Sequence, residues 1–84
     1  MFEVVIEKRA WRELQSLPPA EQKQILHKIF LILRQSPFPK GKNPKRLVGE
    51  SAYRLRMGNY RVLYTINGRV VQIYAIAHRK DVYR

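Results

Sequence analysis

The sequence predicts an α+β fold in a single domain: an N-terminal strand, two helices that form a helical hairpin, and a three-stranded antiparallel meander, all in one sheet. Three observations predict it. Apolar residues alternate at the N-terminus, recur at helical spacing through the middle, and alternate again in the C-terminal third. Two dipeptides of glycine and asparagine divide that last third. A chain of 84 residues has room for one modest core, so we assign residues 1–84 to one domain.

The N-terminal segment starts with a short strand over residues 2–7, where apolar and polar residues alternate. Residues 8–17 follow as a short amphipathic helix, which Pro18 and Pro19 terminate. The side chains expected to face the core from these two elements are Phe2, Val4, Ile6, Trp11, Leu14 and Leu17.

A longer helix is predicted over residues 19–35. Pro19 suits its first turn, and Glu21 lies near its positive end. Its broad apolar stripe consists of Ile25, Leu26, Ile29, Phe30, Ile32 and Leu33. His27 falls opposite this stripe and is expected at the surface.

Residues 36–51 are predicted to be a basic loop, because proline, glycine and asparagine recur among its charges. Its cations are Lys40, Lys42, Lys45 and Arg46. Charge alone makes them candidates for contacts with the phosphates of a nucleic-acid backbone.

The meander is built on two predicted two-residue turns, Gly58-Asn59 and Asn67-Gly68. The first turn pairs Met57 with Tyr60, Arg56 with Arg61, Leu55 with Val62 and Arg54 with Leu63. The second pairs Ile66 with Arg69, Tyr64 with Val71, Val62 with Ile73 and Arg61 with Tyr74.

Alternation then divides the meander between two faces. The face toward the helices is expected to hold Tyr53, Leu55, Met57, Tyr60, Val62, Tyr64, Val71, Ile73 and Ala75. The opposite face is expected to be an exposed basic surface with Arg54, Arg56, Arg61, Leu63, Gln72, Tyr74 and His78. Guanidiniums gathered in this way repel one another, which favours a polyanion as their ligand.

Composition points the same way. The chain carries 17 Lys and Arg against 6 Asp and Glu, a formal net charge of +11, which favours nucleic acid over an anionic membrane as the partner. It has no cysteine, which excludes disulfides, thiolate zinc sites and thiol nucleophiles. Its scattered carboxylates do not suit catalytic magnesium, so we expect neither a metal nor another cofactor. No apolar run is long enough to span a bilayer, and we expect a cytoplasmic protein.

Metal-free cleavage of RNA needs a base for the 2′-OH, cations around the phosphorane, and an acid for the leaving 5′-oxygen. The arginines supply the cations. His78 can exchange protons near neutral pH, and Tyr83 can stack on a base or help to position the nucleophile. Each also has a structural interpretation, His78 as an ordinary polar residue at a strand end and Tyr83 as a terminal anchor.

Two motifs carry a resemblance to a known family. The segment 53–64, YRLRMGNYRVLY, and the segment 78–83, HRKDVY, follow a strand, two helices and a basic loop. The whole chain resembles the RelE/ParE toxin superfamily. The RelE branch implies an endoribonuclease that enters the vacant ribosomal A site, cuts mRNA, and is neutralised by an antitoxin protein.

The resemblance places basic active-site positions on Arg54, Arg56, Arg61 and Arg79, and a stacking tyrosine on Tyr83. Two of these arginines replace lysines of the prototype, and arginine keeps its proton. We therefore nominate His78 as the group that exchanges protons, with Arg79 or His78 protonating the leaving oxygen. The alternatives are a ParE-like inhibitor of DNA gyrase without ribonuclease activity and an RNA-binding module without catalysis.

Overall fold

The structure, a computed structural model, describes residues 1–47, 49 and 51–78. Its elements are β1 (Glu3–Ile6), α1 (Lys8–Gln15), α2 (Pro19–Lys28), η1 (Ile29–Leu33), β2 (Lys45–Arg46), β3 (Tyr53–Met57), β4 (Tyr60–Asn67) and β5 (Val70–His78). The predicted α+β class and its order of strand, helices and meander are confirmed. In this described part of the chain, no helix is long and apolar enough to cross a membrane.

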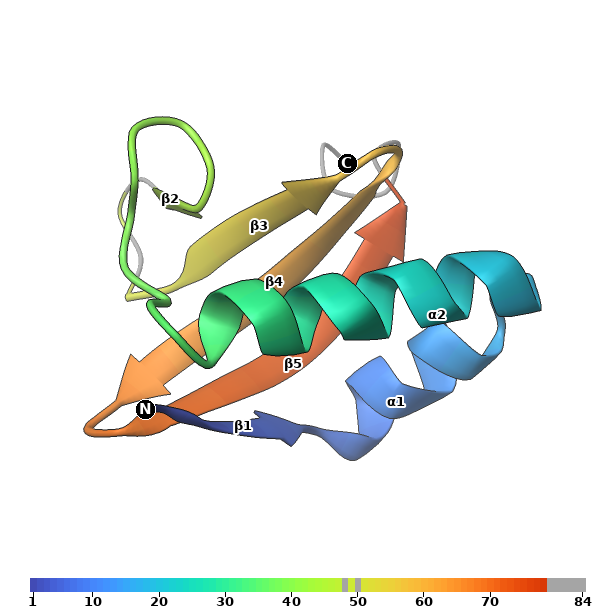
Figure 1. Cartoon of the computed structure of the whole chain (residues 1–84), viewed down its shortest axis with the longest axis horizontal. Helices are drawn as coiled ribbons and strands as arrows, with labels where there is room; N and C mark the ends of the chain where they lie inside the picture. The colour runs from blue at the N-terminus through green and yellow to red at the C-terminus, as the bar shows by residue number, and fades with distance from the viewer. Residues whose placement is uncertain (48, 50, 79–84) are drawn as a thin grey trace.

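All five strands form one sheet in the order β1-β5-β4-β3-β2. The sheet is mixed, because β1 runs parallel to β5 while the other neighbours are antiparallel. The helices lie over one face of this sheet, with α2 crossing the strands and α1 beside the end of β5 (Figure 1). The opposite face is therefore the one that the helices leave uncovered.

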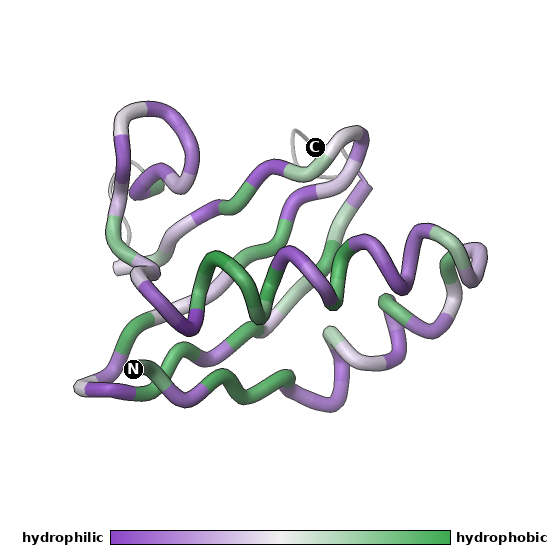
Figure 2. Tube along the Cα trace, in the orientation of Figure 1, coloured by the Kyte–Doolittle hydropathy of each residue, from purple (hydrophilic) through white to green (hydrophobic). Residues whose placement is uncertain are grey.

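The core lies between the helices and the sheet. Its buried side chains are Ala10, Leu14, Ile25, Ile29, Leu33, Leu55, Met57, Val62, Tyr64, Val71, Ile73 and Ile76. Phe2, Val4 and Ile6 pack against this cluster from β1, as predicted. Figure 2 shows the corresponding alternation of apolar and polar residues along the strands.

The predicted helix over residues 19–35 is present as α2 continued by η1, a turn of π-helix. Ile25, Ile29 and Leu33 form its buried line, whereas Phe30 is 43% exposed. The prediction that Phe30 belongs to the core is therefore wrong, because Phe30 lies about 100° around the helix axis from Ile29 on the buried line. His27 is at the surface, as predicted.

Trp11 is also misplaced by the sequence prediction, since it is 42% exposed. The buried line of α1 consists instead of Ala10 and Leu14. Adjacent helical positions differ by about 100° around the axis, so the choice between Ala10 and Trp11 decides the orientation of the helix. The small side chain of Ala10 lets α1 approach the sheet closely.

The β3–β4 hairpin matches its prediction at every pair. Met57 pairs with Tyr60, Arg56 with Arg61, Leu55 with Val62 and Arg54 with Leu63. Gly58 takes the first turn position with φ of +59°, a backbone conformation that favours glycine.

The predicted pairing of β4 with β5 is wrong. The turn residues are Gly68 and Arg69, so Asn67 pairs with Val70 and Tyr64 pairs with Ile73. This register differs from the predicted one by two residues, which leaves each side chain on its predicted face up to Ile73.

A bulge then changes the faces of β5. Tyr64 pairs with Ile73, but Leu63 pairs with Ala75, so Tyr74 is an extra residue in the strand. Beyond it, alternation is inverted. Ala75 was predicted to face the core, but it pairs with Leu63 on the face away from the helices. His78 was predicted on that face with the arginines, but it pairs with Tyr60 on the helix side.

The basic loop of residues 36–51 contains a short strand that the sequence did not predict. Lys45 and Arg46 form β2, which pairs with Arg54 and Tyr53 of β3. The backbone N–H of Leu47 donates to the carbonyl of Ala52 at 2.9 Å, which closes the loop that leads into β3.

Candidate functional site

Three arginines lie on the sheet face away from the helices. Arg56 and Arg61 are cross-strand partners, and Arg54 lies two residues from Arg56 on the same strand. We call these three residues the arginine row. Their shared face follows from the β3–β4 register, which the sequence predicted correctly.

The arginine row is much less exposed than predicted. Arg56 is exposed, but Arg54 is 9% exposed and Arg61 only 1%. Arg61 lies on the central strand, with Arg56 on one side and Ala77 on the other. Reduced solvent screening in such a position strengthens the attraction between a guanidinium and an anion.

Arg54 is tied to the basic loop. Its Nη2 donates a hydrogen bond to the carbonyl oxygen of Lys42 at 2.9 Å. The loop thus lies against β3 and covers the side chain of Arg54, while Arg56 stays open to solvent.

All four predicted loop cations are exposed: Lys40, Lys42, Lys45 and Arg46. The β2–β3 register separates two of them. Lys45 pairs with Arg54 and therefore lies on the face of the arginine row, whereas Arg46 pairs with Tyr53 on the helix side. Lys45 extends the line of cations, and Arg46 does not.

His78 lies apart from the arginine row. It pairs with Tyr60 at the end of β5, and the two rings meet edge to face with centroids 5.3 Å apart. The Tyr60 hydroxyl donates to Oε2 of Glu21 at 2.8 Å. This hydrogen bond is the main reason why the pKa of Tyr60 is raised. His78 thus belongs to a chain of contacts that leads toward α2.

The remaining predicted site residues, Arg79 and Tyr83, lie outside the described residues. Their roles stay predictions from the family resemblance.

The structure adds two polar residues that the sequence did not single out. The side chain of Asn43 binds both backbone groups of Arg56, with Nδ2 to the carbonyl oxygen at 3.0 Å and Oδ1 to the N–H nitrogen at 2.7 Å. No local sequence pattern identifies a partner 13 residues away.

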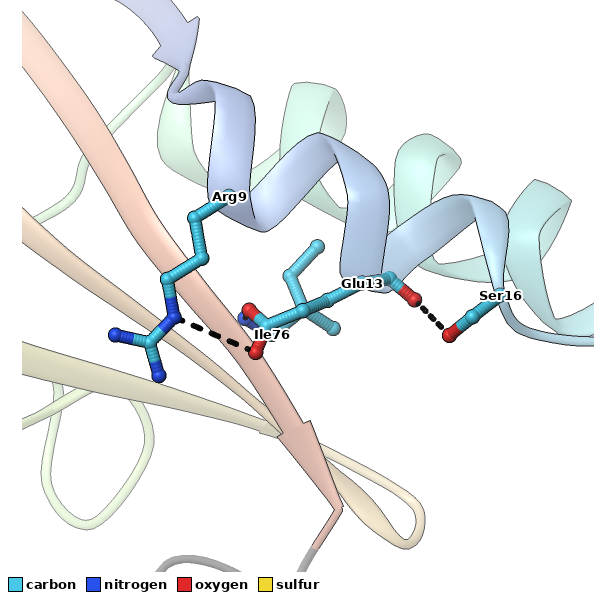
Figure 3. Close-up of polar contacts among 4 residues, drawn as sticks. All are labelled: Arg9, Glu13, Ser16 and Ile76. Atoms are coloured by element: carbon cyan, nitrogen blue, oxygen red, sulfur yellow. Dashed lines mark hydrogen bonds and ion pairs between the residues drawn. The ribbon is translucent and has the colours of Figure 1, made fainter.

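The second is Glu13 of α1. Its Oε1 accepts a hydrogen bond from the N–H of Ile76 at 2.9 Å, at the edge of β5 that β1 leaves uncovered. Figure 3 shows this carboxylate reaching the strand, with Arg9 at 3.6 Å from its other oxygen. Glu13 therefore anchors the end of β5.

Comparison with known proteins matches this architecture to one family. The family described as "ParE toxin of type II toxin-antitoxin system, parDE" matches residues 4–83. The protein named RelE1 from Methanocaldococcus jannaschii is 36% identical over 87 residues, which cover 99% of this chain and 96% of that protein.

Solved structures give the same relationship. The toxin–antitoxin complex RelBE2 from Mycobacterium tuberculosis contains a chain with a TM-score of 0.79 and 30% identity, covering 93% of this chain and 98% of its own. The archaeal RelE–RelB complex from Pyrococcus horikoshii gives a TM-score of 0.74 and 33% identity, covering 93% and 94%. The chain belongs to the RelE/ParE superfamily of toxins from type II toxin–antitoxin systems.

Proposed function

We propose that this toxin is a ribosome-dependent endoribonuclease that cuts mRNA in the A site and so inhibits translation. One observation carries the proposal: Arg56 and Arg61 are cross-strand partners on the face that the helices leave uncovered, beside Arg54. Like charges held in this way destabilise a sheet, and a bound phosphate would relieve their repulsion.

In the proposed reaction the 2′-oxygen forms a bond to the adjacent phosphorus, and the bond from phosphorus to the 5′-oxygen breaks. The products are a 2′,3′-cyclic phosphate and a free 5′-hydroxyl. Arg56 is exposed and contacts the phosphorane, where it stabilises the negative charge that develops, and the buried Arg61 beside it adds its positive charge without direct contact. No metal takes part, in keeping with the scattered carboxylates of the chain.

The 2′-proton passes to water, because arginine cannot accept it and His78 pairs with Tyr60 on the helix side of the sheet. Arg79 stabilises the negative charge on the leaving 5′-oxygen, which takes its proton from water, and Tyr83 stacks on a neighbouring base. Both of these roles follow the family resemblance. Lys40, Lys42 and Lys45 contact backbone phosphates, whereas Arg46 points to the helix side and contributes less.

The proposed protein partner is an antitoxin, and the proposed location is the cytoplasm, where ribosomes and mRNA are found. The related structures from Mycobacterium tuberculosis and Pyrococcus horikoshii are toxin–antitoxin complexes. A segment with carboxylates would complement a chain of net charge +11.

The test is primer extension on mRNA from programmed ribosomes treated with purified protein. We expect A-site cuts with the wild type and a loss of at least 100-fold in rate with Arg56→Ala, the magnitude usual for a transition-state charge contact. Arg69→Ala is the matched control, because Arg69 is an exposed arginine in the β4–β5 turn. Equal cleavage by both variants would refute the proposed site.

A second candidate function is inhibition of DNA gyrase by protein contact, because the matching family description names ParE. Supercoiling assays with the same protein separate the two functions. Inhibition of gyrase without mRNA cleavage would favour the second. RNA binding with neither activity would indicate a module that only binds RNA.

A further inference from the structure

The side chain of Asn43 takes the place of a strand at the outer edge of β3. β2 pairs only with Tyr53 and Arg54, and Arg56 lies beyond its end. There the Asn43 amide donates to the carbonyl oxygen of Arg56 at 3.0 Å and accepts from its N–H at 2.7 Å. The reversed amide would set donor against donor and acceptor against acceptor, so the backbone of Arg56 fixes the orientation of Asn43.

The neighbouring residue makes a second attachment. The carbonyl oxygen of Lys42 accepts a hydrogen bond from Nη2 of Arg54 at 2.9 Å. Lys45 then pairs with Arg54 through β2. Residues 42, 43 and 45 are thus all joined to β3, within a loop that otherwise stands away from the sheet (Figure 1).

These attachments hold cations close together. Lys42 and Lys45 are exposed, and the two attachments join their segment to the strand that carries the exposed Arg56. Like charges at this spacing repel one another, so a loop free to move would swing its lysines away from β3. The Asn43 amide is neutral and prevents this movement without neutralising any cation.

We propose that Asn43 is a positioning residue that keeps Lys42 and Lys45 in line with Arg56, which makes one extended surface for the phosphates of RNA that flank the cut. Asn43 itself touches no substrate. The inference rests on the proposed function, because it takes single-stranded RNA as the ligand. It adds the loop lysines to the binding surface as an ordered part of it.

The experiment measures binding of a short single-stranded RNA by fluorescence anisotropy at several KCl concentrations, with amide hydrogen exchange on the free protein. Asn43→Ala changes no charge. We expect it to weaken RNA binding about tenfold and to reduce the salt slope by at least about 0.7, the contribution of one phosphate contact on a single strand. Exchange of the Arg56 amide should become faster by at least tenfold. Asn59→Ala, in the exposed β3–β4 turn, is the control and should change neither quantity.

A double-mutant cycle links the effect to the lysines. Lys42→Ala with Lys45→Ala should reduce the slope in the same way while Arg56 exchange stays slow. The triple variant that also carries Asn43→Ala should bind RNA almost as well as the double lysine variant. Fully additive effects would overturn the inference, as would faster exchange with unchanged binding. Failure of the wild type to bind RNA at all would instead refute the proposed function, together with this role that depends on it.

Discussion

The phenolic oxygen of Tyr64 lies 2.6 Å from the carbonyl oxygen of Pro37, to which it donates a hydrogen bond inside the core. Tyr64 is fully buried on the central strand, and its ring stacks on that of Tyr53 with centroids 5.6 Å apart. This contact fixes the chain where it leaves η1 and enters the basic loop. The loop that carries the lysines is therefore tied to the core at its start.

Tyr64→Phe removes this bond and leaves the buried Pro37 carbonyl without it. We expect a loss of about 1–3 kcal/mol in the free energy of unfolding, measured by urea denaturation. Tyr53→Phe is the comparison, because it keeps the stacked ring and lies closer to solvent. An equal loss in both variants would contradict this assignment.

Stability should also fall in alkali. Burial raises the pKa of Tyr64 above its ordinary value of 10.0. Above pH 10 the unfolded chain releases this proton while the folded chain retains it, so the free energy of unfolding decreases as pH rises, by at most about 1.4 kcal/mol per pH unit. The slope above pH 10 should be smaller in Tyr64→Phe. Identical slopes for both proteins would show that Tyr64 ionises equally in both states.

Glu13→Ala should loosen the end of β5. It removes a charged acceptor from the Ile76 N–H, and we expect a loss of about 1.5–3 kcal/mol and faster exchange of that amide. Glu13→Gln keeps an acceptor and should lose less. Glu3→Ala, which removes an exposed carboxylate from β1, is the control. The assignment fails if Ile76 exchange is the same in all three variants.

Gly58→Ala should destabilise the β3–β4 hairpin. A Cβ on Gly58 would meet no atom within 4 Å, so the only cost is the positive φ of +59°. For alanine this is about 1–2 kcal/mol. Gly58→Asn should cost less, since asparagine tolerates this conformation better. Thermal denaturation of the two variants provides the measurement, and equal losses would point to a cause other than backbone conformation.

His78→Ala should leave the pH dependence of mRNA cleavage between pH 5 and 8 unchanged, because His78 pairs with Tyr60 on the helix side of the sheet, opposite the face of the arginine row. We expect at most a tenfold lower rate, from loss of the ring contact. Single-turnover cleavage at several pH values measures this. Disappearance of an ionisation from the profile would restore His78 as a proton-transfer group.

The parts of the fold that sequence predicts well have strong local determinants. Gly58 followed by Asn59 fixes the β3–β4 turn, and from that turn the register of the arginine row follows. The N-terminal residues Phe2, Val4 and Ile6 likewise form one continuous apolar face, whereas the other face carries Glu3 and Glu7 beside Val5. In both cases a turn or a contrast between polar and apolar residues determines the register of the strand or the face on which its side chains lie.

The errors arise where that contrast disappears. From Ile73 to Ala77 each residue is apolar or aromatic, so the sequence gives no sign of the bulge at Tyr74. Charge misled the prediction for Arg61, which is 1% exposed although its charge assigned it to the surface. The Asn43 contacts depend on tertiary structure and have no local pattern.

The bulge at Tyr74 also affects how related sequences are aligned. If a homologue has one residue more or fewer between Ile73 and His78, the side chains at the end of β5 lie on the opposite face of the sheet, even when their identities are the same. An alignment gap that is misplaced by one position would therefore assign the imidazole to the face of the arginine row, although it lies beside a tyrosine on the other face. Homologues should be superposed in space before a histidine at this place is equated with a histidine in another toxin.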